Sequence, residues 1–555
     1  MPAFTMTDWV VVAAYFAVLL GVILATRRRQ DTTTDYFLAG RNVGFFAIGA
    51  SIFASNIGSE HVVGLAGQGA ATGLAMAHYE LHAWIVVLLA WIFVPFYYNS
   101  KVFTMPEFLE RRFGPRPRWI LSLVSLATYV LTKVSVTVYA GAVVFKALLP
   151  DAFGGPENAF WIGAISTVVL TGLYTIAGGL RAVLYTDAIQ TVVLIVGSAL
   201  ITWFGLEMLG GWSELRAFAS ENVAQYQLWR PLSDPDFPWL GILIASPVVG
   251  IWYWCTDQYI VQRTLAAKDL STARRGALFG AFLKVWPVLI FLVPGLIGAA
   301  LHAKGLMVIP ENDGGGFASD QVFPTMVTHL LPVGLRGLVV AGLMAALMSS
   351  LSSLFNSTAT LFTVDIYEKI RPNASERQYV NIGRMATVVV VVLGLLWIPI
   401  MPKVSGGGLY QYLQNVQGYL APPITAVFLL GIFNDRINQR GATWGLSLGF
   451  VLGFAKLSLQ AFFGEGKIET PALLAAIGDF NFLYFSGVLM LIVVAVVIGM
   501  SRTAPAPRRE DLAGLTMSTV DRAEVRASWN RTDVIATAVV LSLIAAIYGY
   551  FSFWI

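Results

Sequence analysis

The sequence predicts an all-α membrane protein that crosses the bilayer many times. Of its 555 residues, 57% are hydrophobic and only 12% are charged, and the mean hydropathy is +0.69. A soluble chain carries about 25% charged residues, and here apolar runs recur at the length that a helix needs to cross a bilayer. This composition excludes a soluble enzyme, a disordered chain and a nucleic-acid binder. The single cysteine, Cys255, excludes a disulfide framework.

About 14 apolar segments are long enough to be transmembrane helices. They cover residues 8–26, 44–70, 76–98, 119–148, 160–177, 184–208, 239–262, 276–301, 331–363, 378–401, 409–432, 441–463, 477–500 and 532–553. The loops between them are too short for a second folded domain, so we predict one transmembrane domain over residues 1–555.

The positive charges predict how the chain is oriented in the membrane. The arginines at 27–29 follow the first apolar segment, which is therefore not a cleaved signal peptide. Lys and Arg collect on the cytoplasmic side, so we expect both termini to lie outside. The Asn-x-Ser/Thr matches at Asn356, Asn373 and Asn530 fall in a span or inside. With arginine outnumbering lysine, we expect the plasma membrane, and specifically a bacterial inner membrane.

Two apolar segments, five apart in the series, contain interruptions. Residues 54–61 (Ala-Ser-Asn-Ile-Gly-Ser-Glu-His) interrupt the second segment, and residues 246–250 (Ser-Pro-Val-Val-Gly) interrupt the seventh, followed by 252–258 (Trp-Tyr-Trp-Cys-Thr-Asp-Gln). Paired interruptions in inverted halves indicate the central site of a transporter, because unwound backbone can coordinate an ion in a cavity but cannot face lipid. An ordinary Gly/Pro kink is the alternative for each segment.

Ionisable residues within the spans are a second signal of function. Glu80, Lys133 and Lys284 lie deep in their segments, and Asp187 lies in another. Such groups are costly in a membrane, so they face a cavity or a partner. A purely structural ion pair is the alternative interpretation.

His78 and His82 are four residues apart, a spacing that allows two imidazoles to share a metal. Glu80 projects from another side of the same helix, and no third ligand is evident. Two histidines at a solvated external helix end are the competing interpretation. A metal-dependent membrane enzyme is therefore the most distant functional alternative.

Serine hydroxyls cluster inside the ninth span, at residues 349–353 (Ser-Ser-Leu-Ser-Ser). Na⁺ is a hard cation that requires several oxygen ligands, and paired hydroxyls with carbonyls from a broken helix supply them. A packing seam of small residues is the alternative.

In these motifs the chain resembles the sodium/solute symporter family, in particular a bacterial-type member of its sodium/glucose cotransporter branch. The similar segments are 54–59 with His61, 178–187 (Gly-Gly-Leu-Arg-Ala-Val-Leu-Tyr-Thr-Asp), 252–258, 349–360 and 419–423 (Tyr-Leu-Ala-Pro-Pro). The resemblance implies the leucine-transporter-type fold, in which two inverted five-helix repeats (44–208 and 239–432) follow one extra helix (8–26) and precede three more (441–553).

The resemblance also implies a sugar site and its gates. The sugar residues are Asn56, His61, Glu80, Tyr253, Trp254, Lys284 and Gln414, and the outer-gate residues are Leu65, Tyr79 and Tyr410. This set suits a hexose, because each sugar hydroxyl donates and accepts, Glu80 accepts and Lys284 donates. At the position of Gly250, several sugar symporters have a residue with a side chain. The glycine therefore puts one contact to a sugar hydroxyl, and with it the choice among hexoses, in question.

Two sodium sites follow from the same resemblance. The main site consists of Ala54, Ile57, Ala346, Ser349 and Ser350, and the second site consists of Asp187, Ser349, Ser352 and Ser353. Family members that couple one ion lack a hydroxyl at the position of Ser352, so we predict two Na⁺ per sugar. Lys133 is expected to support the sites.

The resulting hypothesis is sodium-driven uptake of a neutral hexose by alternating access. Sugar, sodium ions and the lipid bilayer are the expected partners, and we expect no organic cofactor and no obligate protein partner. The alternatives within the fold are sialic acid, myo-inositol, proline or a monocarboxylate as the solute. Glu80 opposes an anionic solute.

Overall fold

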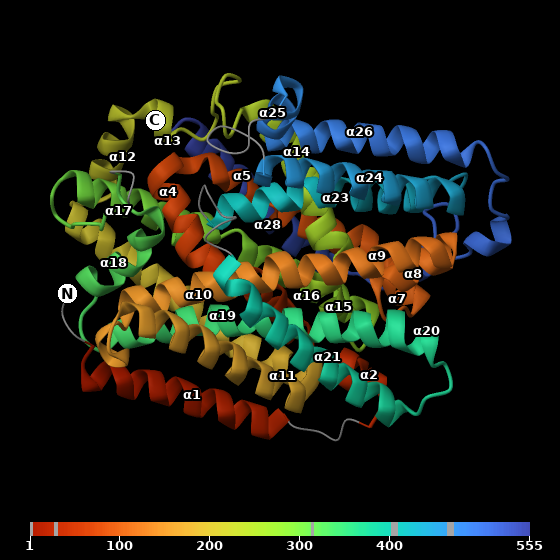
Figure 1. Cartoon of the computed structure of the whole chain (residues 1–555), viewed down its shortest axis with the longest axis horizontal. Coiled ribbons are helices and arrows are strands. Elements are labelled where there is room, and N and C mark those ends of the chain that lie inside the picture. The colour runs from red at the N-terminus through yellow and green to blue at the C-terminus, as the bar shows by residue number, and fades with distance from the viewer. Residues whose placement is uncertain (1–3, 27–30, 312–315, 401–408, 463–470) are drawn as a thin grey trace.

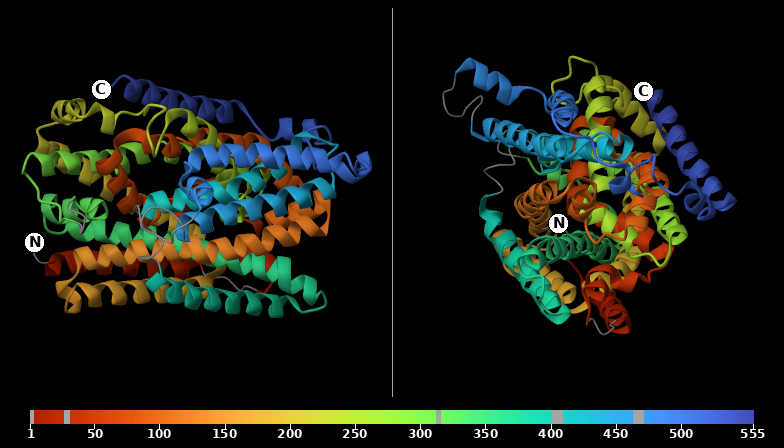
Figure 2. Two further views of the ribbon diagram at one scale, coloured as in Figure 1. Left: turned by 45° about the horizontal axis from the view of Figure 1, so that its top comes forward. Right: turned by 90° about the vertical axis from the view of Figure 1, so that its right-hand side faces the viewer.

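The computed structural model describes residues 4–26, 31–311, 316–400, 409–462 and 471–555. The described chain is helical, and its β pairing consists of two isolated bridges, Val43–Ala267 and Glu311–Phe317. Its long helices lie side by side along the longest axis of the molecule (Figures 1 and 2). This architecture fits a bilayer, where each backbone N–H and C=O must be paired within the protein. The arginines at 27–29 and the predicted span ends at 401 and 463 lie outside the described residues.

The α-helices fall into a first and a second part of the chain. The first part contains α1 (Met6–Thr26), α2 (Thr33–Leu38), α3 (Phe45–Asn56), α4 (Ala66–Thr72), α5 (Ala77–Glu80), α6 (Ala83–Leu88), α7 (Val94–Ser100), α8 (Met105–Phe113), α9 (Pro115–Thr128), α10 (Ser135–Leu148), α11 (Pro156–Leu209), α12 (Trp212–Glu221) and α13 (Val223–Tyr226). The second part contains α14 (Trp239–Ile251), α15 (Gln258–Leu265), α16 (Leu270–Lys284), α17 (Val293–Ala303), α18 (Val322–Leu330), α19 (Leu335–Thr360), α20 (Glu368–Ile370), α21 (Glu376–Trp397), α23 (Leu409–Phe433), α24 (Gln439–Phe462), α25 (Ala472–Asp479), α26 (Phe482–Ser501), α27 (Arg522–Ala527) and α28 (Arg531–Ser552).

Short π-helical and 3₁₀ segments join these helices. The π-helical segments are η2 (Glu60–Leu65), η4 (Leu89–Phe93), η5 (Tyr129–Val134), η7 (Trp252–Thr256), η8 (Val288–Leu292) and η10 (Leu361–Tyr367). The 3₁₀ segments are η1 (Ala39–Arg41), η3 (Gly73–Met76), η6 (Asp151–Phe153), η9 (Ser319–Gln321), η11 (Ile398–Ile400) and η12 (Arg509–Leu512). π-Helical turns are rare and often occur at functional sites.

Eleven helical stretches of the described chain are long and apolar enough to cross a membrane, and α3 and α10 are shorter apolar helices. The predicted spans at 160–177 and 184–208 lie in one element, α11, which is interrupted at Gly179. Gly179 has φ of +55°, and an added Cβ would lie 2.6 Å from the carbonyl oxygen of Tyr36. The all-helical class is confirmed, whereas the count of about 14 spans stays a prediction.

The first interruption lies where the sequence predicts it. Helix α3 ends at Asn56, Ile57 leaves the helical region with φ −90° and ψ 89°, and the chain resumes as η2 at Glu60. The backbone N–H groups of His61 and Val62 both donate to the carbonyl of Gly58. The turn therefore re-forms a helix immediately after the break.

The predicted position of the second interruption, at 246–250, is wrong. Helix α14 continues through Pro247 to Ile251, and the chain breaks later, at the extended residue Asp257 (φ −84°, ψ 127°). Pro247 removes only one backbone donor, and α14 is packed against α23 and α26. At Asp257, in contrast, the carboxylate accepts from the backbone N–H of Tyr259 and so caps the start of α15.

Close packing of α3 against α16 brings two site residues together. An added Cβ at Gly49 would lie 2.6 Å from the carbonyl oxygen of Gly276, and one at Gly280 would lie 2.9 Å from the side chain of Ile52. Small residues allow membrane helices to approach this closely. Since Asn56 ends α3 and Lys284 ends α16, this contact positions both.

Candidate substrate and ion site

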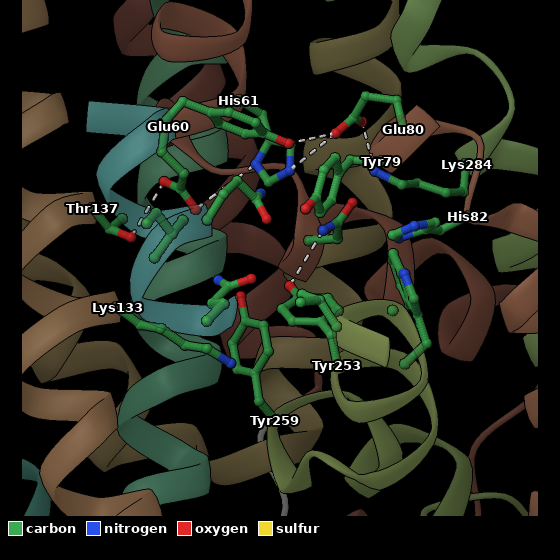
Figure 3. A pocket seen from close by; sticks show the side chains of 18 of the residues that line it. Glu60, His61, Tyr79, Glu80, His82, Lys133, Thr137, Tyr253, Tyr259 and Lys284 are labelled. Carbon is green, nitrogen blue, oxygen red and sulfur yellow. Dashed lines mark hydrogen bonds and ion pairs between the residues drawn. The ribbon is translucent and has the colours of Figure 1, made fainter. Parts of the chain in front are cut away.

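A cavity lies between the two interrupted helices, and its atom-free space, open solvent included, is about 590 Å³. Its lining residues are Asn56, Glu60, His61, Tyr79, Glu80, His82, Lys133, Thr137, Val249, Gly250, Tyr253, Trp254, Tyr259, Lys284, Leu354, Tyr410, Leu413, Gln414 and Gln417. Figure 3 shows the polar side chains converging on it. The seven sugar residues expected from the sequence all line this cavity, as do the gate residues Tyr79 and Tyr410. Leu65 is fully buried in η2 and is not among the lining residues.

One wall of the cavity carries a buried ion pair. The Nζ of Lys284 lies 2.6 Å from Oε2 of Glu80, and both side chains are at most 2% exposed. The hydroxyl of Tyr410 donates to Oε1 of Glu80 over 2.8 Å. A carboxylate has about four acceptor positions and an ammonium has three donors. The pair therefore keeps free donors and acceptors for a polar ligand.

Several buried polar atoms around the cavity have no hydrogen-bond partner within the described residues. They are Asn56 Oδ1, His61 Nδ1, Tyr79 Oη, His82 Nε2 and Gln414 Oε1. Buried polar atoms are nearly always hydrogen-bonded. These atoms are therefore the positions at which a bound solute or water would pair.

Glu60, which the sequence reasoning passed over, is a second carboxylate at the cavity. Its Oε2 accepts from the hydroxyl of Thr137 over 3.3 Å, and its Oε1 lies 3.8 Å from Nδ1 of His61. The other ring nitrogen of His61 lies 3.7 Å from Oε1 of Glu80. His61 thus lies between two carboxylates (Figure 3). The only sign of this arrangement in the sequence is that Glu60 falls within the first interruption.

The second interruption carries its own ion pair. Lys133 on η5 donates to Asp257, and the hydroxyl of Tyr129 donates to the same carboxylate. The Lys133 ammonium also lies 4.8 Å and 4.7 Å from the ring centres of Tyr253 and Tyr259, within the range of cation–π attraction. Asp257 lies in the motif at residues 252–258, but the sequence alone does not indicate its role.

The predicted main sodium site lies at the end of α3. The backbone carbonyl of Ser55 accepts from the hydroxyl of Ser350 on α19 over 3.2 Å and also from the hydroxyl of Tyr259 on α15. The other predicted ligands are Ala54, Ile57, Ala346 and Ser349, each at most 1% exposed. Helix α3 packs against both α15 and α19 here, so oxygen atoms from three helices meet at the break.

Asp187 on α11 is fully buried among serine hydroxyls. Its Oδ1 accepts from Ser349 over 2.6 Å, and its Oδ2 accepts from Ser51 over 2.5 Å. Arg181, six residues before Asp187 on the same helix, does not pair with it, because the Arg181 guanidinium lies over the ring of Tyr185. Two members of the predicted second sodium site are therefore in direct contact.

The other two serines of that site lie close by. The hydroxyls of Ser353 and Ser55 are 2.8 Å apart, and the hydroxyl of Ser352 donates to the carbonyl of Ser349. Arg263, which the sequence reasoning missed, donates from Nε to the hydroxyls of Ser51 and Ser55. This arginine is fully buried, so its charge balances that of Asp187 through shared serines.

The expectation of a solvated end for His78 and His82 is wrong. The two residues are only 1% and 4% exposed, because α28 and the segment after α13 cover this end. His78 is 3.2 Å from both the hydroxyl of Tyr548 and the carbonyl of Leu228. Within the described ranges, no three His, Cys, Asp or Glu side chains are placed to hold a metal.

Comparisons with known proteins agree with this architecture. The profile of the Sodium:solute symporter family matches residues 36–449. The chain is 40% identical to sodium/myo-inositol cotransporter 2 of Oryctolagus cuniculus (94% of this chain, 81% of the relative). It is 38% identical to sodium/glucose cotransporter 4 of Danio rerio (94% and 83%) and 40% identical to sodium/glucose cotransporter 2 of Rattus norvegicus (90% and 79%).

Among solved structures, a substrate-bound, outward-open Na⁺-coupled sialic acid symporter aligns with a TM-score of 0.75. The alignment covers 91% of this chain and 99% of that structure at 24% identity, which supports the predicted leucine-transporter-type fold. The family profile covers most of the chain, and the curated relatives match nearly all of it. The chain therefore belongs to the sodium:solute symporter family and is a sodium-coupled solute transporter.

Proposed function

We propose that this symporter carries a neutral hexose of the glucose or galactose type into the cell together with two Na⁺. The observation that carries the proposal is that all seven expected sugar residues line one cavity, with the Glu80–Lys284 pair at its wall. The proposed orientation has both termini outside, and the start of α1 and the end of α28 lie toward the same end of the molecule (Figure 2).

The charges at the cavity favour a neutral polyol over an anion. Lys284 is compensated by Glu80, and Lys133 by Asp257. Glu60 lies within 4 Å of His61 but of no Lys or Arg among the described residues. A carboxylate-bearing solute such as sialate or a monocarboxylate would approach two acids without a free cation, which is unfavourable in a low-dielectric site.

myo-Inositol is the second candidate solute. It is also a neutral ring of hydroxyls, and the relatives include sodium/myo-inositol cotransporters at 39–40% identity. The same donors and acceptors would serve either ring.

Two driving ions are energetically sufficient for strong accumulation. A potential of 100 mV contributes about 2.3 kcal/mol per charge, and a tenfold Na⁺ gradient adds about 1.4 kcal/mol. One ion therefore supports a sugar gradient of roughly 500-fold, and two ions support about the square of that ratio.

An uptake panel in proteoliposomes tests the solute class. With an inward Na⁺ gradient, labelled glucose or galactose should accumulate, because the cavity pairs hydroxyls and repels anions. Proline and sialate should neither accumulate nor compete, and replacement of Na⁺ by choline should abolish uptake. Competition by sialate at concentrations comparable to the sugar would refute the neutral-hexose proposal, and accumulation of myo-inositol alone would replace it with the second candidate.

Gln414→Ala tests whether the cavity is the sugar site. Removing this amide leaves a sugar hydroxyl unpaired in a dry site, at a cost of about 1–3 kcal/mol. The half-saturating sugar concentration should therefore rise about 5- to 150-fold without loss of membrane insertion. Gln68→Ala is the matched control, since Gln68 is equally buried but does not line the cavity. An unchanged sugar affinity in Gln414→Ala would mean that the sugar binds elsewhere.

Ser352→Ala, Asp187→Asn and Ser350→Ala separate the two sodium sites. Asp187→Asn replaces a full charge with a dipole, so the second ion should be lost, and the reversal potential should move from the two-ion value towards the one-ion value. Ser352→Ala should move it in the same direction, whereas Ser350→Ala should abolish coupled uptake. Ser486→Ala, at a buried serine on α26, is the control. The two-ion proposal would be contradicted if the reversal potential of the parent protein already had the value for one Na⁺ per sugar and Ser352→Ala did not change it.

A further inference from the structure

We infer that His82 is a substrate-contacting residue that takes the place of the side chain absent at Gly250 and pairs with one hydroxyl of the sugar. The inference rests on the proposed function, because it assumes that the solute in the cavity is a sugar. The inference adds a residue to the site. It assigns to His82 the sugar-hydroxyl contact that Gly250, which has no side chain, cannot make.

The first observation is an unsatisfied nitrogen at the cavity wall. His82 lies in the turn between α5 and α6, lines the cavity and is only 4% exposed. Its Nε2 is buried and has no hydrogen-bond partner within the described residues. A buried ring nitrogen left unpaired is costly, so a ligand or water must satisfy it.

The second observation is the fit between the imidazole and Gly250. A Cβ added at Gly250 would lie 2.3 Å from Cδ1 of Ile85, 2.9 Å from Nδ1 of His82 and 3.0 Å from Cε1 of His82. The imidazole edge and the Ile85 side chain therefore share the space that a side chain at position 250 would take. Nε2 is the next atom around the ring from this edge, and His82 lies beside Lys284 on the same side of the cavity (Figure 3).

The third observation is the contrast with His78, four residues earlier. Both ring nitrogens of His78 have partners, the hydroxyl of Tyr548 and the carbonyl of Leu228, and the residue does not line the cavity. His78 therefore has a structural role, with both ring nitrogens hydrogen-bonded within the protein. His82 has the same burial and presents an unpaired nitrogen at the site.

The chemistry of imidazole suits this role. A neutral ring nitrogen either donates or accepts, depending on the tautomer, and a sugar hydroxyl can do both. We therefore expect one hydrogen bond between His82 and a hydroxyl at one position of the sugar ring. This bond adds to the contacts from Glu80 and Lys284 on the same wall.

The test compares binding of glucose and its set of monodeoxy derivatives by the full-length protein in saturating Na⁺. The parent protein should bind one particular monodeoxy sugar more weakly than glucose by about 5- to 150-fold. In His82→Asn, whose shorter amide does not reach the position of Nε2, that one ratio should fall to near 1 while the other ratios remain. His82→Gln places an amide near the position of Nε2 and should retain it. His78→Gln is the matched control and should leave every ratio unchanged.

A second set of variants tests the shared space directly. Gly250→Ser should weaken sugar binding because its Cβ would lie 2.3 Å from Cδ1 of Ile85 and 2.9 Å from Nδ1 of His82. In an Ile85→Val background, which lacks that Cδ1, adding His82→Asn to Gly250→Ser should recover affinity, since the shorter side chain vacates the remaining space and the serine supplies a hydroxyl. Additive losses of Gly250→Ser and His82→Asn in the Ile85→Val background would overturn the replacement.

The outcomes distinguish this inference from the function on which it rests. A uniform loss of affinity for all sugars in His82→Asn, or no loss at all, would overturn the role of His82 while leaving sugar transport intact. A parent protein that binds none of these sugars would overturn the proposed function and the inference together.

Discussion

The break at the end of α3 is the feature on which both proposed sites depend. Its unwound backbone lies inside a membrane protein, where no bulk water can pair it. The carbonyl of Ser55 accepts from the hydroxyls of Ser350 and Tyr259, and the side-chain amide of the next residue, Asn56, donates to the hydroxyl of Tyr253 over 3.3 Å. Ser55 therefore contacts the proposed ion site and Asn56 the proposed solute site, and this adjacency would couple the two sites directly.

Charge compensation is the second constraint on the site. Two deeply buried ion pairs join distant segments, Glu80 with Lys284 and Lys133 with Asp257. Asp187 is surrounded by serine hydroxyls that it shares with Arg263. Removing one partner of a buried ion pair is strongly destabilising. These ion pairs are therefore important to the fold as well as to the proposed site. Because both cavity lysines are matched by carboxylates, the charges support the proposal of a neutral solute.

Much of the membrane architecture could be predicted from the sequence, because apolar length and interrupted segments are local properties. The break at residues 54–61 was predicted in this way, and the seven expected sugar residues, which all line the cavity, came from the resemblance. The second break was misplaced because Pro247 is a strong local signal, whereas Asp257 acts through Lys133, a residue 124 positions away. The burial of His82 and the position of Arg263 likewise depend on packing between distant helices, which periodicity does not encode.

The central claim is that Na⁺ and sugar bind to one coupled structure around Ser55 and Asn56. Equilibrium binding of labelled sugar to the purified protein, measured in Na⁺ and in choline, tests it most directly. If the two sites are coupled, Na⁺ should raise the sugar affinity, and sugar should raise the Na⁺ affinity by the same factor. Equal sugar affinity in Na⁺ and in choline would contradict the claim.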